Sequence, residues 1–225
     1  MDIVIPLFDD FEPLDAIGPY QILGYLPGAT VRFVSAGGHG VVADSIGGLR
    51  PEVPTRYSDV ESCDVLVVPG GHGTRPLMTD EAFLDWLRRT HATTRYTASV
   101  CTGALLLGAA GLLDGLAATT HWAAAGELAA HGATYTPERV VRQGRILMAA
   151  GISAGIDMAL HLAALLTDET TARAIQLHAE YDPVPPFDSG SWAKAAPDVR
   201  ERIKRLGRRP ESPSADRAGV QSARR

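Results

Sequence analysis

A cysteine that directly follows a strand-like run is the best candidate nucleophile in this sequence. Residues 95–100 form a predicted strand, Cys101 comes next, and the small-residue, leucine-rich stretch 102–111 predicts a helix. A strand running straight into a helix, with the nucleophile at the turn, is the elbow geometry of many hydrolases. The helix N-terminus stabilises a thiolate, so this placement predicts a lowered pKa for Cys101. A buried structural cysteine is the alternative interpretation.

A glycine-rich loop offers a second part of the site. Gly70 and Gly71 follow the clearest strand of the chain, and backbone N–H groups of such a loop can bind a developing anion. Gly103 and Ala104 are small, which lets another loop approach the elbow. The GxxxxGK[ST] pattern of a phosphate loop is missing, and an ordinary tight turn explains the two loop glycines equally well.

Asp15 and His121 are candidates for proton transfer. Asp15 lies in an otherwise apolar stripe near the end of the first strand, and a buried acid usually has a partner or a role. Proton transfer beside a thiolate is its functional interpretation, and capping of the first helix is the alternative. His121 could activate Cys101 as a Cys–His pair, but capping or packing is equally plausible. The neighbouring acids Asp9, Asp10 and Glu12 are interpreted as solvated loop charges.

The elements that must position these residues alternate between strand and helix. Predicted strands are 2–8, 31–35, 64–68, 95–100, 140–141 and 146–149, with a hairpin-like excursion over 41–49. Predicted helices are 13–25, 80–91, 102–111, 122–130, 152–166 and 170–180. This order predicts an α/β fold with a mostly parallel sheet and helices on both faces. Chemistry in such sheets gathers beyond the carboxyl ends of the strands, so we expect the loops at 9–15, 69–73, 101 and 151 to meet.

Composition narrows the classes of protein. A chain of 225 residues, 45% hydrophobic and 21% charged, is typical of a globular protein. Apolar runs are short and no secretory signal is visible, so we expect a cytoplasmic protein with no membrane partner. Residues 200–225 carry nine basic and three acidic residues, against 12 and 23 in the rest. An acidic body argues against nucleic-acid binding, and the basic tail 207–225 is predicted to be disordered.

Two cysteines and seven histidines complete the inventory of reactive side chains. Cys63 and Cys101 make a poor disulfide framework, and Cys63 is interpreted as a small buried apolar residue. The histidines show no metal-ligand spacing, so we expect no metal site.

Several blocks of the sequence together resemble the DJ-1/PfpI superfamily and, within it, the isonitrile hydratase branch. They are LDAIGPY (14–20), VPGGHG (68–73), SVCTGALLLGAAGLL (99–113), ATTHW (118–122), GISAGID (151–157) and EYDPVPPFDSGS (180–191). Some also occur in sensor domains of AraC-type regulators, but the stretch after the last block is too short for a helix-turn-helix pair. Thr102 stands where PfpI-type proteases have His. The first-helix acid is Asp15, as in isonitrile hydratases, where DJ-1-like proteins have Glu.

The resemblance implies a flavodoxin-like, class I glutamine amidotransferase-like single domain over residues 1–206. It implies a cofactor-independent lyase that adds water to a small-molecule isonitrile and forms an N-substituted formamide through a thioimidate on the cysteine. A homodimer is also implied. The implied catalytic residues are Cys101 (nucleophile), Asp15 (general acid/base) and Thr102 (hydroxyl support of the thiolate), and the implied substrate-binding residues are Gly70, Gly71, Ile152 and His121.

Two alternatives to the hydratase remain from the sequence. One is a glyoxalase or deglycase acting on 2-oxoaldehydes with the same thiol. The other is a non-enzymatic ligand or oxidation sensor, in which Cys101 forms sulfenic or sulfinic acid.

Overall fold

The computed structural model describes residues 1–37 and 40–206. Contacts divide the chain into two units, Met1–Tyr181 and the segment that begins at Asp182, and each is described by itself. The first unit is an α/β domain. The described part of the second carries one helix, α8 (Pro197–Leu206). The predicted disordered tail, 207–225, lies outside the described residues.

The α/β domain is built on a seven-stranded sheet in the order β10-β11-β7-β6-β1-β2-β5. All neighbouring strands run parallel except β10 and β11. The strands are β1 (Asp2–Pro6), β2 (Thr30–Ser35), β5 (Thr55–Arg56), β6 (Val65–Val68), β7 (Tyr96–Val100), β10 (Val140–Gln143) and β11 (Ile146–Ala149). Two short ladders lie outside this sheet: β3 (Gly40–Val41) with β4 (Glu52–Val53), and β8 (Ala117–Ala118) with β9 (Thr134–Tyr135).

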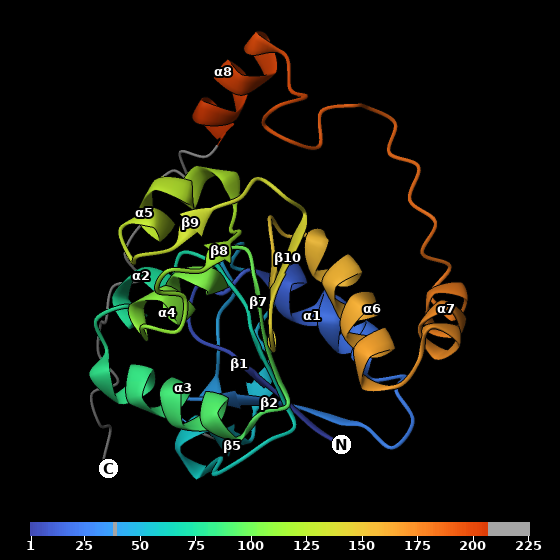
Figure 1. Ribbon diagram of the computed structural model, residues 1–225. Helices are drawn as coiled ribbons and strands as arrows, with labels where there is room; N and C mark the ends of the chain where they lie inside the picture. Colours follow the sequence, from blue (N-terminus) through green and yellow to red (C-terminus); the bar gives the residue numbers. More distant parts are fainter. Residues whose placement is uncertain (38–39, 207–225) are drawn as a thin grey trace, which may run out of the picture. The chain divides into compact units, whose positions relative to one another are not determined.

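Helices cover both faces of the sheet (Figure 1). On one face α1 (Pro13–Leu23) lies beside α6 (Ala154–Leu166), and α7 (Glu169–His178) packs on α6. The opposite face carries α2 (Thr74–Leu77), α3 (Glu81–Thr93) and α4 (Gly103–Ala109), with α5 (Ala125–Ala129) next to α4. This is the predicted α/β fold with a mostly parallel sheet.

Strands β1 and β6 at the centre of the sheet carry continuous apolar runs, and both of their faces are buried. Successive side chains of a strand point to opposite faces. Ile3 and Ile5 of β1 therefore join the cluster under α1 and α6, and Val4 joins the cluster under α3 and α4. Continuous apolar runs of this kind are typical of a parallel sheet covered on both sides.

Most predicted elements are confirmed with small shifts of their bounds, and some predictions need correction. The hairpin-like excursion expected over 41–49 is confirmed as the antiparallel pair β3 and β4 with the connection between them, in which the buried Asp44 carboxylate accepts the N–H of Leu49 at 3.2 Å. The helix expected at 122–130 is a 3₁₀ turn (Trp122–Ala124) followed by α5. The sequence pattern does not predict the short elements β4, β5, β8, β9 and α2, nor helix α8. Within the described residues, no helix has the length and apolar character needed to span a bilayer.

Candidate active site

Four loops meet at the carboxyl edge of the sheet, as the sequence predicts. Strands β11, β7, β6 and β1 are consecutive neighbours, so the loops that follow them converge. The N–H of Glu12, after β1, donates to the carbonyl of Gly70, after β6, at 2.8 Å. The N–H of Cys101, after β7, donates to the carbonyl of Ala150, after β11, at 2.7 Å. Chain segments far apart in the sequence thus form one site.

Cys101 occupies the turn between β7 and α4 in a left-handed conformation, with φ of +56°. Such a conformation is unfavourable for a non-glycine residue and persists only when the surroundings hold it. Here the Cys101 N–H is bound by Ala150, and its carbonyl accepts the Thr120 hydroxyl at 2.9 Å. The side chain is 6% exposed. The predicted elbow is therefore present.

The elbow is pressed against the end of β6. A Cβ atom at Gly103 would lie 2.1 Å from the carbonyl oxygen of Val68, a distance that no side chain can occupy. At Gly70 a Cβ atom would lie 2.5 Å from the backbone nitrogen of Thr102. Glycine is needed at both positions because the two backbones touch. This confirms that a small residue after the elbow lets another loop approach.

Asp15 reaches the elbow from α1 and is fully buried. Its Oδ2 accepts the Gly70 N–H at 2.9 Å, and the Cys101 thiol is close enough to lower the pKa of the carboxyl. Oδ1 has no partner at ordinary hydrogen-bond geometry among the described residues. The N-cap of α1 is Glu12, so Asp15 does not cap this helix. A buried carboxyl with a free oxygen beside a thiol is suited to proton transfer.

The buried environment opposes negative charge on both groups. Burial is the main cause that raises the pKa of Asp15 well above its usual value, against the N–H of Gly70, which lowers it. Burial and the Asp15 carboxylate raise the pKa of the Cys101 thiol, against the N–H groups of Thr102 and Ile152, which lower it. The expectation of a lowered Cys101 pKa is therefore wrong for this protein without ligand. The two groups do not both ionise near neutral pH.

The N–H groups of the glycine loop are bound within the protein, whereas the sequence analysis interprets them as donors to an anion. The Gly70 N–H is taken by Asp15, and the Gly71 N–H donates to the Thr102 hydroxyl at 2.9 Å. That hydroxyl in turn donates to the Gly71 carbonyl at 3.1 Å. Neither loop N–H is free to bind an anion, and the Thr102 hydroxyl fixes the loop. The donors that face the thiol are the backbone N–H groups of Thr102 and Ile152.

Glu12 belongs to the site, although the sequence suggested a solvated loop charge. It is partly buried, its Oε2 accepts the Ser45 hydroxyl at 3.1 Å, and its carboxylate raises the pKa of both Asp15 and Cys101. Nothing in the local sequence separates Glu12 from Asp9 and Asp10. Only the convergence of the loops after β1 and β6 brings it close.

His121 packs beside the loop that carries Ile152. Its Nδ1 accepts the Ala123 N–H at 3.3 Å. This is the capping role that the sequence analysis gives as an alternative to a Cys–His pair. A Cβ atom at Gly151 would lie 2.8 Å from His121 Cδ2, so the ring lies against this glycine. Burial and the positive charge of Arg75 lower the pKa of His121. The imidazole is therefore neutral near pH 7, and its ring packs against the loop that carries Ile152.

Arg75 and Glu127 form a polar group that the sequence did not reveal. Their side chains pair at 2.8 Å, and Arg75 also donates to the Gly71 carbonyl at 3.3 Å. The two residues are 52 positions apart, with no motif linking them. This ion pair ties α5 to the glycine loop.

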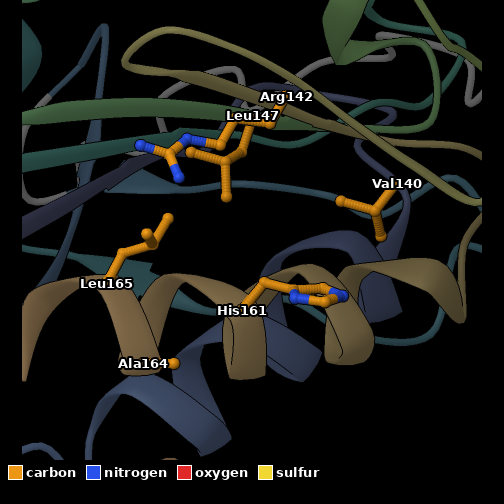
Figure 2. A pocket seen from close by; sticks show the side chains of 6 residues that line it. All are labelled: Val140, Arg142, Leu147, His161, Ala164 and Leu165. Atoms are coloured by element: carbon orange, nitrogen blue, oxygen red, sulfur yellow. The ribbon is translucent and has the colours of Figure 1, made fainter. Parts of the chain in front are cut away.

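A hollow lies at the sheet edge, and the candidate site residues do not line it (Figure 2). It has a volume of about 250 Å³ between β10, β11 and α6. Leu147 and Leu165 point into it from opposite sides, and the Arg142 side chain lies beside Leu147 (Figure 2). Across residues 1–37 and 40–206, no three His, Cys, Asp or Glu side chains gather in a metal-binding group.

Known proteins carry the same architecture. Residues 1–165 match the model of the DJ-1/PfpI family. Isonitrile hydratase of Pseudomonas putida is 48% identical over 185 residues, which cover 82% of this chain and 80% of that protein. A THiJ/PfpI family protein from Pseudomonas syringae superposes with a TM-score of 0.86 at 36% identity, covering 91% of this chain and 85% of the other. Drosophila melanogaster DJ-1beta superposes with a TM-score of 0.72 at 20% identity, covering 81% and 98%, which shows the fold alone.

Proposed function

Because this chain belongs to the DJ-1/PfpI family, we propose that it uses the family scaffold as an isonitrile hydratase, adding water to an isonitrile to give an N-substituted formamide. The observation that carries the proposal is the buried pair of Asp15 and Cys101 at the elbow, with two backbone N–H groups facing the sulfur. The 48% identity to isonitrile hydratase of Pseudomonas putida supports the choice of substrate class.

In the proposed reaction, Asp15 and Cys101 share one proton and one negative charge. Asp15 in its acid form gives its proton to the terminal carbon of R–N≡C, and the Cys101 thiolate attacks the same carbon. A C–H and a C–S bond form, leaving a thioimidate, R–N=CH–S, on Cys101 and a carboxylate on Asp15. The rise in the pKa of Asp15 by burial is what makes it an acid near neutral pH.

Water completes the cycle with the same two groups. Its oxygen attacks the thioimidate carbon while the Asp15 carboxylate takes one proton and passes it to the substrate nitrogen. The C–S bond then breaks, the hydroxyl proton returns to Asp15, and the formamide R–NH–CHO leaves. The backbone N–H groups of Thr102 and Ile152 stabilise the departing thiolate. Every atom is accounted for by substrate and water, and the residues return to their starting state.

The sensor alternative is weaker on physical grounds, and the glyoxalase alternative is separated by experiment. Cysteines that act as oxidation sensors have low pKa values and are exposed to solvent, whereas Cys101 is 6% exposed and its pKa is raised. A glyoxalase or deglycase would use the same thiol, and no contact in the site favours a 2-oxoaldehyde over an isonitrile. Turnover of methylglyoxal is therefore a comparison arm of the test.

The test is formamide production from an alkyl and an aryl isonitrile by the unmodified enzyme and by two variants. Cys101→Ala is expected to reduce the rate to background, and Asp15→Asn to reduce kcat by about 100- to 10,000-fold. Cys63→Ser is the matched control, since Cys63 is the other free cysteine of the described residues, and it should keep full activity. An inert wild type, or a Cys101→Ala variant that keeps its rate, would refute the proposal, and turnover of methylglyoxal alone would favour the glyoxalase.

We also propose that the protein is a homodimer and that it is located in the cytoplasm. Three large apolar side chains of α1, spaced three residues apart, are exposed: Leu14 by 38%, Ile17 by 40% and Tyr20 by 41%. An apolar stripe of this kind supports burial against a second copy of the chain. Sedimentation equilibrium gives the mass in solution, and a monomer at micromolar concentration would contradict the homodimer.

A further inference from the structure

Ile152 holds an unfavourable backbone conformation at the point where its N–H faces the nucleophile. Its φ of +35° lies in the left-handed region, which is a genuine outlier for a β-branched residue. Its N–H is one of the two backbone N–H groups that lower the pKa of the Cys101 thiol. Conformations of this cost persist only where neighbouring contacts impose them. The contacts that impose this one must lie on both sides of Ile152 in the chain.

One arginine contacts the chain on both sides of Ile152. The Arg139 carbonyl accepts the Ala150 N–H at 2.9 Å, two residues before Ile152. Its guanidinium donates through Nη2 to the Ser153 hydroxyl at 3.3 Å, one residue after Ile152. Its Nε pairs with the Asp157 carboxylate one turn further along α6. Arg139 therefore bridges the start of β10 to the whole loop between β11 and α6.

Asp157 and Tyr181 hold this arginine in place. The Tyr181 hydroxyl donates to Asp157 Oδ1 at 3.1 Å, while Asp157 Oδ2 receives Arg139. Tyr181 is itself fixed after α7, because its N–H donates to the Gln176 carbonyl and its carbonyl accepts the Gln176 side-chain amide. We call Arg139, Asp157 and Tyr181 the Arg139 clamp. Its side chains do not touch the reacting atoms.

We propose that Arg139 is a positioning residue which, held by Asp157 and Tyr181, keeps the Ile152 N–H directed at the Cys101 sulfur. The inference rests on the proposed role of Cys101 as nucleophile. Loss of the clamp lets Ile152 relax towards an ordinary conformation, and the thiolate then loses one of its two backbone donors. The consequence is a smaller thiolate fraction of Cys101, while the side chains of Cys101 and Asp15 stay unchanged.

The charges of the clamp allow this mechanism to be separated from a direct electrostatic effect. If Arg139 and Asp157 acted on the thiolate only through their charges, removing the cation would raise the Cys101 pKa and removing the anion would lower it. Positioning predicts the same direction for both, because either change frees the loop. Tyr181→Phe and Arg139→Lys change no charge, so only positioning predicts an effect.

The experiment is the rate of alkylation of Cys101 by iodoacetamide at fixed pH, in a Cys63→Ser background. At a pH below the thiol pKa this rate reports the thiolate fraction, and a tenfold fall corresponds to a rise of about one pH unit in the pKa. We expect Arg139→Ala, Arg139→Lys, Asp157→Ala and Tyr181→Phe all to slow alkylation, by about tenfold in the two alanine variants and less in the others. Circular dichroism and thermal melts confirm that each variant is folded.

The matched control is an exposed ion pair of similar kind on α3, Arg88 with Asp85, where Asp85→Ala should leave the alkylation rate unchanged. Alkylation that accelerates in Asp157→Ala while slowing in Arg139→Ala would overturn positioning in favour of a direct charge effect. Unchanged rates in Arg139→Lys and Tyr181→Phe would also overturn it. None of these measurements uses an isonitrile, so their outcome is independent of whether the hydratase activity is found.

Discussion

The central feature at the scale of single residues is the pairing of a buried acid with a buried thiol. The sequence placed Cys101 at a helix N-terminus, which favours a thiolate, but it gave no measure of burial or of the negative charges nearby. Burial together with Asp15 outweighs the two N–H donors. In the proposed reaction the thiolate therefore forms only when the shared proton lies on Asp15.

Asp15→Asn is expected to move reactivity and turnover in opposite directions. Without the neighbouring carboxylate the Cys101 pKa falls, and alkylation at fixed pH accelerates by tenfold for each unit. Turnover falls because the proton donor is lost. Alkylation rates at pH 8 and kcat, both in a Cys63→Ser background, check this. Glu12→Gln, which removes the more weakly acting carboxylate, is expected to give a smaller acceleration. A slower alkylation in Asp15→Asn would contradict the assigned coupling.

At the scale of elements, the junction of β7 and α4 depends on its contact with the end of β6. Gly103→Ala would place a methyl group 2.1 Å from the Val68 carbonyl oxygen. Overpacking of this kind costs about 1–3 kcal/mol. In a chain of this length each kcal/mol lowers the Tm by about 2–4 °C, which calorimetry can measure.

The control for this prediction is another helical glycine with free space around it. At Gly126 of α5 an added Cβ meets nothing within 4 Å, so Gly126→Ala should leave the Tm unchanged or raise it slightly. Equal melting temperatures for the two variants would show that the elbow tolerates movement away from β6.

The sequence predicts an element or a contact when the residues that identify it are close together in the chain. The apolar runs of β1 and β6 and the amphipathic helix α3 follow from periodicity, and Cys101 follows from its place between β7 and α4. Short elements such as β5 carry too few residues for a pattern. Arg139 and Asp157 lie 18 positions apart in unrelated elements, so no motif could join them. Contacts of that kind come from topology alone.

At the scale of the whole molecule, the sheet is also fastened at the end opposite the site. Arg145 donates to the carbonyls of His91 and Thr94 at 2.7 Å and approaches His91 Nε2 at 2.9 Å. His91 Nδ1 lies 2.8 Å from the Thr97 hydroxyl, at the start of β7. These contacts connect the β10–β11 turn, α3 and β7, and burial with the charge of Arg145 lowers the pKa of His91 from 6.5 to about 4.

We therefore expect protonation of His91 to lower the free energy of unfolding at acid pH. Its pKa is lower in the folded state, so the unfolded chain binds more protons between pH 6.5 and about 4. This contribution is present above pH 6.5 and is lost as the pH falls through that window. Because the His91 side chain is only partly buried, solvent screening reduces the effect of this shift, and we expect a loss on the order of 2 kcal/mol in the free energy of unfolding. Urea denaturation from pH 7 to pH 4 measures it, and in His91→Gln the pH-dependent part should be smaller. Parallel curves for the two proteins would exclude His91 as the cause.

The left-handed conformation of Cys101 means that the residue best for stability at this position differs from the residue that the proposed reaction needs. Glycine adopts a φ of +56° without the cost of about 1–2 kcal/mol that a side chain incurs. Cys101→Gly should therefore melt at a higher temperature than Cys101→Ala, although neither variant turns over substrate. A selection for heat resistance alone would drift towards glycine here. Cysteine survives at the elbow only where the reaction itself is under selection.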